Sequence, residues 1–471
     1  LRRRRAERRG RAGLRLARSH DLGAHHARRP SDGERGRARH RDAPLSRSPS
    51  RQEDEHQPDR LDLRVDSRSR APRQTRPYAG SHQFRQHARA GVHRGGGGRR
   101  DDQGLGGAHQ QRHQVVDDRR VPLRHRPSPA GEDGQSVMRA VVLTEYGGPE
   151  LLRIAEVPVP VPAADEVLVR VHATALNRAD LLQRRGLYPN PFPGAHDIPG
   201  MEFAGEVVEA PTSGDVTHRR ASRWKPGDHV MGIVSGGAYA EYLVIPAAQA
   251  MRTPRGMLLG DAAAIPEVFI TAWDALVLQG GLRAGQTALV HAGASGVGTA
   301  AIQICRAIGA RIIVTCSTSK VQACRNLGAH LVVDYTKDDF AKSVGEFTSN
   351  GGVEVVLDVI GGDYTVRNVA CLALKGRIIQ VGTMAGPSAN FNVASLMPKR
   401  ASITGTVLRP RPKEEKIAVS QAFAEALLPD FDAGVLKPII DKRFAFDQIV
   451  QAHQHMEANA NVGKIVVDVA R

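Results

Sequence analysis

The feature that most constrains this chain is a glycine-rich turn between two apolar segments. It lies in the stretch ALVHAGASGVGTAAIQICRAIGARIIVTCSTSK, residues 288–320. The apolar runs at 287–291 and 311–315 predict two short buried strands, and the residues after Gly298 predict a helix. A strand, a glycine turn, a helix and a second strand within about 30 residues predict a doubly wound parallel sheet.

The turn itself predicts a binding site for the pyrophosphate of a dinucleotide. Gly293, Gly296 and Gly298 let backbone N–H groups come close to a ligand, and the start of the helix adds partial positive charge. Because the spacing Gly-x-x-Gly-x-Gly differs from the commoner fingerprint, a purely structural turn is the alternative. The order of the elements favours dinucleotide binding.

The end of the second strand indicates which dinucleotide. An NAD site normally has a carboxylate about 20 residues after the first glycine, where it accepts from the ribose 2′-OH. This chain instead has Ser317, Ser319 and Lys320, with Arg325 further on. Hydroxyls and cations suit a 2′-phosphate, which an acid would repel. We therefore expect NADPH as the cofactor; the alternative is a solvated lysine at the start of a surface helix.

Charge separates the first 137 residues from the rest of the chain. Residues 1–137 contain 33 arginines, no lysine and 17 acidic residues, a net charge of +16, whereas 138–471 carry +1. This segment has few large apolar residues and predicts a disordered leader. A nucleic-acid-binding tail, a transit peptide or a misassigned start would each explain it. The sequence favours a misassigned start, with the natural protein beginning at Met138, and the near-neutral remainder argues against a nucleic-acid-binding groove.

The remaining composition favours a cytoplasmic protein. No apolar run reaches the 18 or more residues of a membrane span, and no secretory signal is present. The four cysteines form no C-x-x-C pair and are expected to be buried thiols in a reducing compartment.

Hydrophobic periodicity divides the chain into further segments. Residues 138–260 show short alternating runs that predict a small β-barrel, and 261–400 alternate between strand and helix patterns. Residues 401–471 end in GKIVVDV, a strand expected to return to the barrel. Two domains in this order predict a cleft in which a nicotinamide and its acceptor meet.

Several motifs in combination resemble a known family: ALNRADLLQRRGLYP, IPGMEFAGEV, AAAIPEVFITAW, VHAGASGVGTAAIQ, LDVIGG and MEANANVGKIV. They are similar to the zinc-free quinone oxidoreductases of the medium-chain dehydrogenase/reductase superfamily, and most of all to the tumour-suppressor-inducible branch. The resemblance begins at Met138 and covers about 330 residues. It implies a GroES-like β-barrel catalytic domain, a Rossmann domain and a homodimer.

The same resemblance implies that the site holds no metal. The zinc-dependent alcohol dehydrogenases of the superfamily have a cysteine ligand where this chain has Asn177, and a histidine where it has Met201. Catalytic zinc needs three nitrogen, sulfur or oxygen ligands from the protein. An amide and a thioether at two of these positions do not provide them.

The resemblance also names candidate site residues. The expected catalytic residues are Tyr188, which donates to a developing oxyanion or gates the cleft, together with Asn177, Asp180 and Ser295. For Tyr188 the alternative is an ordinary loop residue, and for Asn177 and Asp180 it is a turn. The expected cofactor-binding residues are Gly293, Ser295, Gly296, Val297, Gly298, Ser317, Lys320, Tyr335, Gly382, Thr383 and Asn461.

The expected function is NADPH-dependent reduction of a quinone without zinc. Without a Lewis acid, alcohol oxidation lacks stabilisation of its alkoxide, whereas an electrophilic quinone accepts hydride readily. An alternative is reduction of the carbon–carbon double bond of an enone or alkenal. Nucleic-acid binding through residues 1–137 is a further alternative from another class.

Overall fold

The computed structural model describes residues 136–192, 194–211 and 224–470. Residues 1–135 of the expected leader lie outside the described residues, so its disorder and its origin stay predictions. Within the described ranges, no helix is both long enough and apolar enough to cross a membrane.

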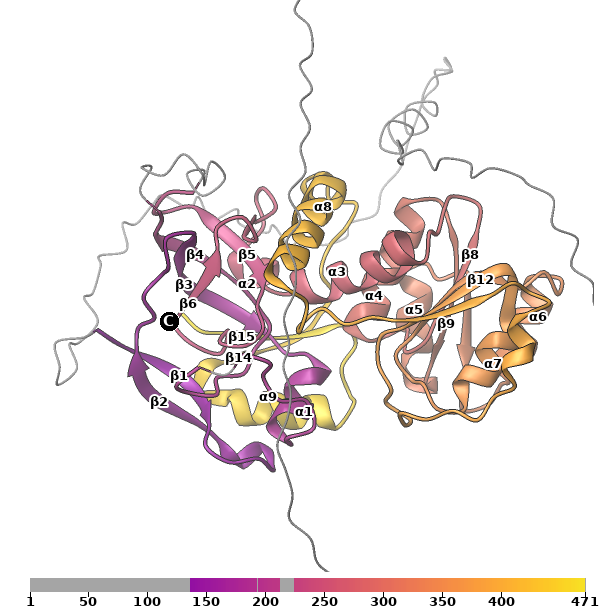
Figure 1. Ribbon diagram of the computed structural model, residues 1–471, viewed down its shortest axis with the longest axis horizontal. Helices are drawn as coiled ribbons and strands as arrows, with labels where there is room; N and C mark the ends of the chain where they lie inside the picture. Colours follow the sequence, from indigo (N-terminus) through magenta and orange to yellow (C-terminus); the bar gives the residue numbers. More distant parts are fainter. Residues whose placement is uncertain (1–135, 193, 212–223, 471) are drawn as a thin grey trace, which may run out of the picture. The chain divides into compact units, whose positions relative to one another are not determined.

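Residues 166–252 and 440–468 contribute the strands of a seven-stranded sheet (Figure 1). Its order is β14-β15-β3-β4-β5-β7, and β6 also pairs with β3. All neighbours are antiparallel except β14 and β15. The strands are β3 (Glu166–Ala175), β4 (Glu202–Glu209), β5 (His229–Ile233), β6 (Tyr242–Pro246), β7 (Met251–Arg252), β14 (Ile440–Ala445) and β15 (Lys464–Asp468). An antiparallel pair, β1 (Val137–Leu143) and β2 (Leu152–Pro158), forms a separate sheet.

The middle of the chain forms a six-stranded parallel sheet in the order β10-β9-β8-β11-β12-β13. Its strands are β8 (Thr287–Val290), β9 (Arg311–Cys316), β10 (Leu331–Asp334), β11 (Val353–Asp358), β12 (Leu372–Gln380) and β13 (Ser402–Gly405). This is the 3-2-1-4-5-6 order of a dinucleotide-binding fold, so the predicted doubly wound sheet is confirmed. The sheet extends past residue 400, where the sequence pattern ended it, because β13 pairs with β12.

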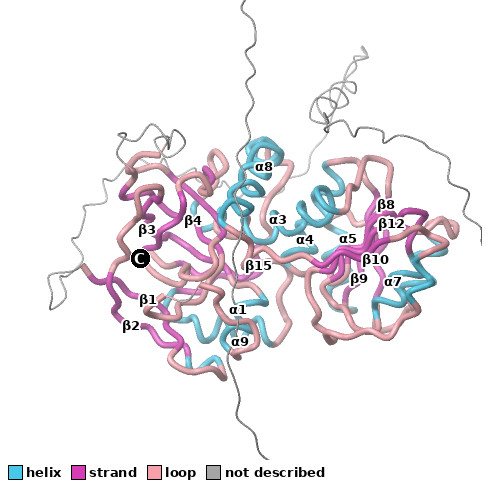
Figure 2. Tube along the Cα trace, viewed as in Figure 1, coloured by secondary structure: helices cyan, strands magenta, loops and turns pink. Residues whose placement is uncertain are grey.

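Helices cover both faces of the parallel sheet (Figure 2). Alternate residues of each strand point to opposite faces: Val290 packs with α4, whereas Leu289 packs with α6 and α7. The strands are therefore apolar on both sides, as buried parallel strands usually are. The helices around this sheet are α4 (Gly296–Ala307), α5 (Val321–Asn326), α6 (Phe340–Phe347) and α7 (Tyr364–Cys371).

Helix α3 (Pro266–Trp273) joins the two sheets, because it contacts β4 and β5 on one side and α4 on the other. Pro266 stands in its first turn, where a missing N–H costs nothing, and the helix continues as a π-helical turn, Asp274–Gln279. The other helices are α1 (Arg178–Arg184), α2 (Leu259–Ala262), α8 (Lys413–Asp432) and α9 (Ile449–Glu457). The fold combines a GroES-like β region with a Rossmann sheet, as expected.

Candidate active site

The glycine turn takes its shape from contacts that leave no room for side chains. A Cβ atom at Gly293 would lie 2.5 Å from the Cβ of Val314, and one at Gly298 would lie 2.4 Å from the carbonyl oxygen of Ala292. Ser295 is the N-cap of α4, and its Oγ accepts a hydrogen bond from the N–H of Gly298 at 3.0 Å. The turn therefore holds backbone close to the start of a twelve-residue helix, a suitable place for a phosphate.

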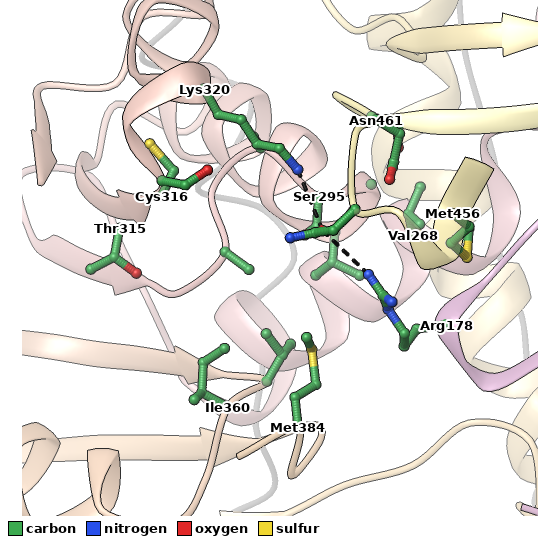
Figure 3. Close-up of a pocket in the computed structure, with 18 of the residues that line it drawn as sticks. Arg178, Val268, Ser295, Thr315, Cys316, Lys320, Ile360, Met384, Met456 and Asn461 are labelled. Carbon is green, nitrogen blue, oxygen red and sulfur yellow. Dashed lines mark hydrogen bonds between the residues drawn. The ribbon is translucent and has the colours of Figure 1, made fainter. Parts of the chain in front are cut away.

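A pocket of about 460 Å³ opens beside this turn. Strands of both sheets contribute to its lining, with Thr315 and Cys316 from β9 and Lys464 from β15. Figure 3 shows Thr315 and Cys316 together with Ser295 and Lys320. The expected site residues that line it are Asn177, Ser295, Gly296, Val297, Ser317, Lys320, Tyr335 and Asn461. Among the described residues, its lining also contains Arg178 and Lys464, which makes three cationic side chains with Lys320, and no aspartate or glutamate.

Six expected site residues lie outside the pocket lining. Gly293 and Gly298 belong to the turn, where a Cβ at either position would collide with neighbouring atoms. Asp180 contacts Asn177 and accepts a hydrogen bond from its N–H. Gly382 and Thr383 come just before the residues that do line the pocket, Met384 and Ala385.

The sixth, Tyr188, is half-buried. The Arg409 guanidinium lies 5.2 Å from the centre of its ring and donates to its backbone oxygen. Burial, with a smaller contribution from Glu267, raises the pKa of the Tyr188 phenol. Arg409 therefore holds Tyr188 through both its ring and its backbone. The role of Tyr188 toward an electron acceptor stays a prediction.

Asn177 is held by a buried charged network. Lys464 Nζ donates to Asn177 Oδ1 at 2.8 Å and forms an ion pair with Glu202 Oε1 at 2.7 Å. Asn177 Nδ2 donates to the same Glu202 oxygen at 2.8 Å. Both charged side chains are almost fully buried, so this network fixes the Asn177 side chain where it faces the pocket. Neither Lys464 nor Glu202 was among the expected catalytic or cofactor-binding residues.

Asp180 supports Asn177 from inside the protein. Its Oδ2 accepts from the Asn177 N–H at 2.7 Å and from the Tyr239 hydroxyl at 3.1 Å, whereas Oδ1 has no partner. Burial raises the pKa of the Asp180 carboxyl to about 6, although the Asn177 N–H and the charge of Lys464 lower it. Asp180 therefore supports Asn177 and is absent from the pocket lining, and its expected catalytic role stays a prediction.

The residues after β9 differ from those of an NAD site. Ser317 and Lys320 line the pocket there, and a nearby carboxylate, Asp334, does not. Hydrogen bonds from the hydroxyls of Thr318 and Thr336 lower the pKa of Asp334 to about 2. Those hydroxyls hold the Asp334 carboxylate, and Asp334 is absent from the pocket lining.

The donor set does not fit a catalytic zinc ion. At the two positions where the resemblance implies zinc ligands in the zinc-dependent enzymes, Asn177 and Met201 offer an amide and a thioether. The ammonium group of Lys464 lies among the oxygen atoms of Leu176, Asn177 and Glu202, at 2.5–2.8 Å. Within the described ranges, no three histidine, cysteine, aspartate or glutamate side chains are grouped to hold a metal ion.

Glu267, in the first turn of α3, supports a prediction on pH. Burial and the nearby Glu202 carboxylate raise the pKa of Glu267 to about 8. A raised pKa in the folded state stabilises at low pH, and this stability is lost as the pH rises through about 8. Part of the Glu267 side chain still reaches solvent, which reduces the effect. We therefore expect the free energy of unfolding of wild type to fall by about 1 kcal/mol between about pH 6.5 and 8.5.

Urea unfolding across this range tests the prediction with the variant Glu267→Gln, which should not show that loss. Asp180 is a useful internal reference, since its own loss of stability belongs to the range up to about pH 6. If the stability of Glu267→Gln falls as steeply as that of wild type above about pH 6, another group causes the loss.

Two family models match the chain. One, described as an alcohol dehydrogenase GroES-like domain, matches residues 163–255, and another, described as a zinc-binding dehydrogenase, matches 296–425. The quinone oxidoreductase of Homo sapiens is 32% identical over 339 residues, which are 71% of this chain and 98% of that protein. The synaptic vesicle membrane protein VAT-1 homolog of Rattus norvegicus is 30% identical and shares 70% of this chain and 84% of its own length.

Solved structures agree with these relatives. The quinone oxidoreductase of Pseudomonas syringae is 28% identical with a TM-score of 0.62, over 70% of this chain and all of its own. Mycobacterial Rv1454c, solved in complex with NADPH, is 29% identical with the same TM-score and coverage.

A GroES-like region and a Rossmann sheet that share one pocket define a two-domain oxidoreductase. With the sequence relatives above, the chain belongs to the quinone oxidoreductase family of the medium-chain dehydrogenase/reductase superfamily. The narrower resemblance to the tumour-suppressor-inducible branch stays a prediction.

Proposed function

We propose that this oxidoreductase uses NADPH to reduce a quinone and needs no metal. One observation carries the proposal: among the described residues, the pocket lining has Arg178 and Lys320 as cations without an ion-pair partner, Lys464 as a cation paired with the buried Glu202, and no carboxylate. A phosphorylated dinucleotide carries several negative charges, which cations attract and acids repel. The NADPH complex of Rv1454c supports the same cofactor here.

The residues present fit this cofactor. The turn from Ser295 to Gly298 would hold the pyrophosphate, and Ser317, Lys320 and Tyr335 would hold the phosphorylated ribose. Asn177 and Asn461, with Gly382 and Thr383 beside them in our assignment, would surround the nicotinamide end. When bound, NADPH supplies the hydride.

The protein contributes position and electrostatics to the reaction. The network of Lys464 and Glu202 holds Asn177 in one orientation, so its side chain is fixed before any ligand binds. We assign Tyr188 as the donor to the oxygen that becomes negative as the quinone is reduced. A quinone spreads this charge over its own conjugated oxygens, and the site therefore needs no Lewis acid.

The quinone assignment is tested by comparing acceptors. We expect purified protein to oxidise NADPH faster with an ortho-quinone than with a short 2-alkenal, by about 10-fold or more in kcat/KM. A larger kcat/KM with the alkenal would instead assign double-bond reduction. Omitting each acceptor in turn gives the background rate.

A homodimer and a cytoplasmic location also belong to this proposal. Among the described strands, β13 lies at one end of the parallel sheet beside β12, and an edge strand of this kind can pair with a second chain. Sedimentation analysis of the purified chain should give twice the mass of one chain. A single-chain mass at micromolar concentration would remove the dimer from the proposal.

A further inference from the structure

Two cationic side chains from distant parts of the chain meet at one amide oxygen in the pocket wall (Figure 3). Arg178, at the start of α1, donates from Nη2 to Oδ1 of Asn459 at 3.4 Å. Lys320, just after β9, donates from Nζ to the same oxygen, also at 3.4 Å. The two nitrogen atoms are therefore at most 6.8 Å apart, and all three residues line the pocket.

Among the described residues, no acid forms an ion pair with Arg178 or Lys320. Glu457, whose charge acts on Arg178, is paired with Arg184 and Arg185, and Asp441, whose charge acts on Lys320, is paired with His455. The pKa of the Lys320 ammonium is lowered, first by burial and next by the charge of Arg178. The two cations therefore repel each other in the absence of an anion.

The hydrogen bonds to Asn459 are long and use little of the donor capacity. A guanidinium has five N–H donors and an ammonium three, and a neutral amide oxygen is a weaker acceptor than a phosphate oxygen. Asn459 itself has a φ of 52°, in the left-handed region that asparagine tolerates. The cluster is thus an unsaturated donor site that holds its cations close together.

Its location indicates which phosphate it would bind. Lys320 follows the carboxyl end of β9, where dinucleotide-binding folds place the adenosine ribose. The pyrophosphate has its own site, at the turn from Ser295 to Gly298. A phosphate between Arg178 and Lys320 is then the one on the ribose 2′ oxygen.

We propose that Arg178, Lys320 and Asn459 together form the subsite that selects the 2′-phosphate of the cofactor. This inference rests on the proposed use of NADPH and deepens it, because it assigns cofactor selection to a residue of the catalytic domain. Arg178 approaches the phosphate from α1 and Lys320 from the Rossmann sheet. Asn459 holds both cations near their binding positions until the phosphate replaces its amide oxygen.

The experiment measures binding of two fragments, 2′,5′-ADP and 5′-ADP, by calorimetry without turnover. We expect Arg178→Gln and Lys320→Gln each to weaken the binding of 2′,5′-ADP by about 10- to 100-fold, since each removes a charge-assisted hydrogen bond. Binding of 5′-ADP should change by less than about 3-fold. Asn459→Asp should weaken the binding of 2′,5′-ADP at least as much, because the new carboxylate would compete with the phosphate for the two cations.

Arg283→Gln is the control. It makes the same change at an exposed position, and because Arg283 is absent from the pocket lining, both fragments should bind as they do to wild type. Thermal unfolding of each variant shows whether it is folded. Equal weakening of both fragments by Arg178→Gln, or none, overturns the inference, since Arg178 would then serve the pyrophosphate or nothing. If wild type does not prefer 2′,5′-ADP, the proposed use of NADPH fails instead.

Discussion

Replacing Lys464 by methionine is expected to lower the free energy of unfolding by about 3–5 kcal/mol. The Lys464 ammonium is almost fully buried and donates to three oxygens, on Leu176, Asn177 and Glu202. Removing it leaves the buried Glu202 carboxylate with the Asn177 amide and the Glu267 N–H but without its counter-charge. The loss therefore reflects an uncompensated buried charge as well as lost hydrogen bonds.

A double-mutant cycle measures this coupling by urea unfolding. Glu202→Gln in the Lys464→Met background removes the unpaired charge, and we expect it to recover about half or more of the lost stability. The control is an ion pair at a partly exposed position, Arg170 with Glu206 at 2.6 Å. Arg170→Met should cost less than about 1 kcal/mol. If Lys464→Met and Arg170→Met lowered the free energy of unfolding equally, the role assigned to the buried network would be contradicted.

The second large effect is expected at the glycine turn. Gly298→Ala should weaken binding of the dinucleotide by about 100-fold or more, equivalent to about 2.7 kcal/mol. The new Cβ would meet the Ala292 oxygen at 2.4 Å and the Gly293 carbonyl carbon at 2.5 Å, so the backbone of the turn must move. Its N–H groups would then no longer face the phosphate.

Gly405→Ala is the control for this substitution. A Cβ at Gly405 has no neighbouring atom within 4 Å, so this variant should bind as wild type does. Circular dichroism and thermal unfolding verify that both variants are folded. If Gly298→Ala binds the dinucleotide with unchanged affinity, the turn does not hold the pyrophosphate.

Local patterns predicted the parallel sheet well. Runs of β-branched residues placed β8 and β9, because fully buried strands are apolar on both faces and their ends are marked by glycine. Strand β13 was missed, since Ser402–Gly405 is short and largely exposed and offers no such run.

The residues that line the pocket were predicted where one short segment supplies them and were missed where distant segments meet. Ser295, Ser317 and Lys320 follow two consecutive strands, and they line the pocket. Lys464 lies 287 residues from its partner Asn177, and Arg178 lies 281 residues from Asn459. No local spacing reveals these pairs. A cation in the closing strand, within the motif MEANANVGKIV, was the one available signal for Lys464.

The central claim is that a pocket without zinc prefers the phosphorylated cofactor. Its most direct measurement is a calorimetric titration of chelator-dialysed protein with NADPH and then with NADH, with the zinc content of the same sample determined. We predict that NADPH binds at least about 10-fold more tightly, a difference of about 1.4 kcal/mol, to protein with no stoichiometric zinc. Tighter binding of NADH, or binding that returns only when zinc is added, would contradict it.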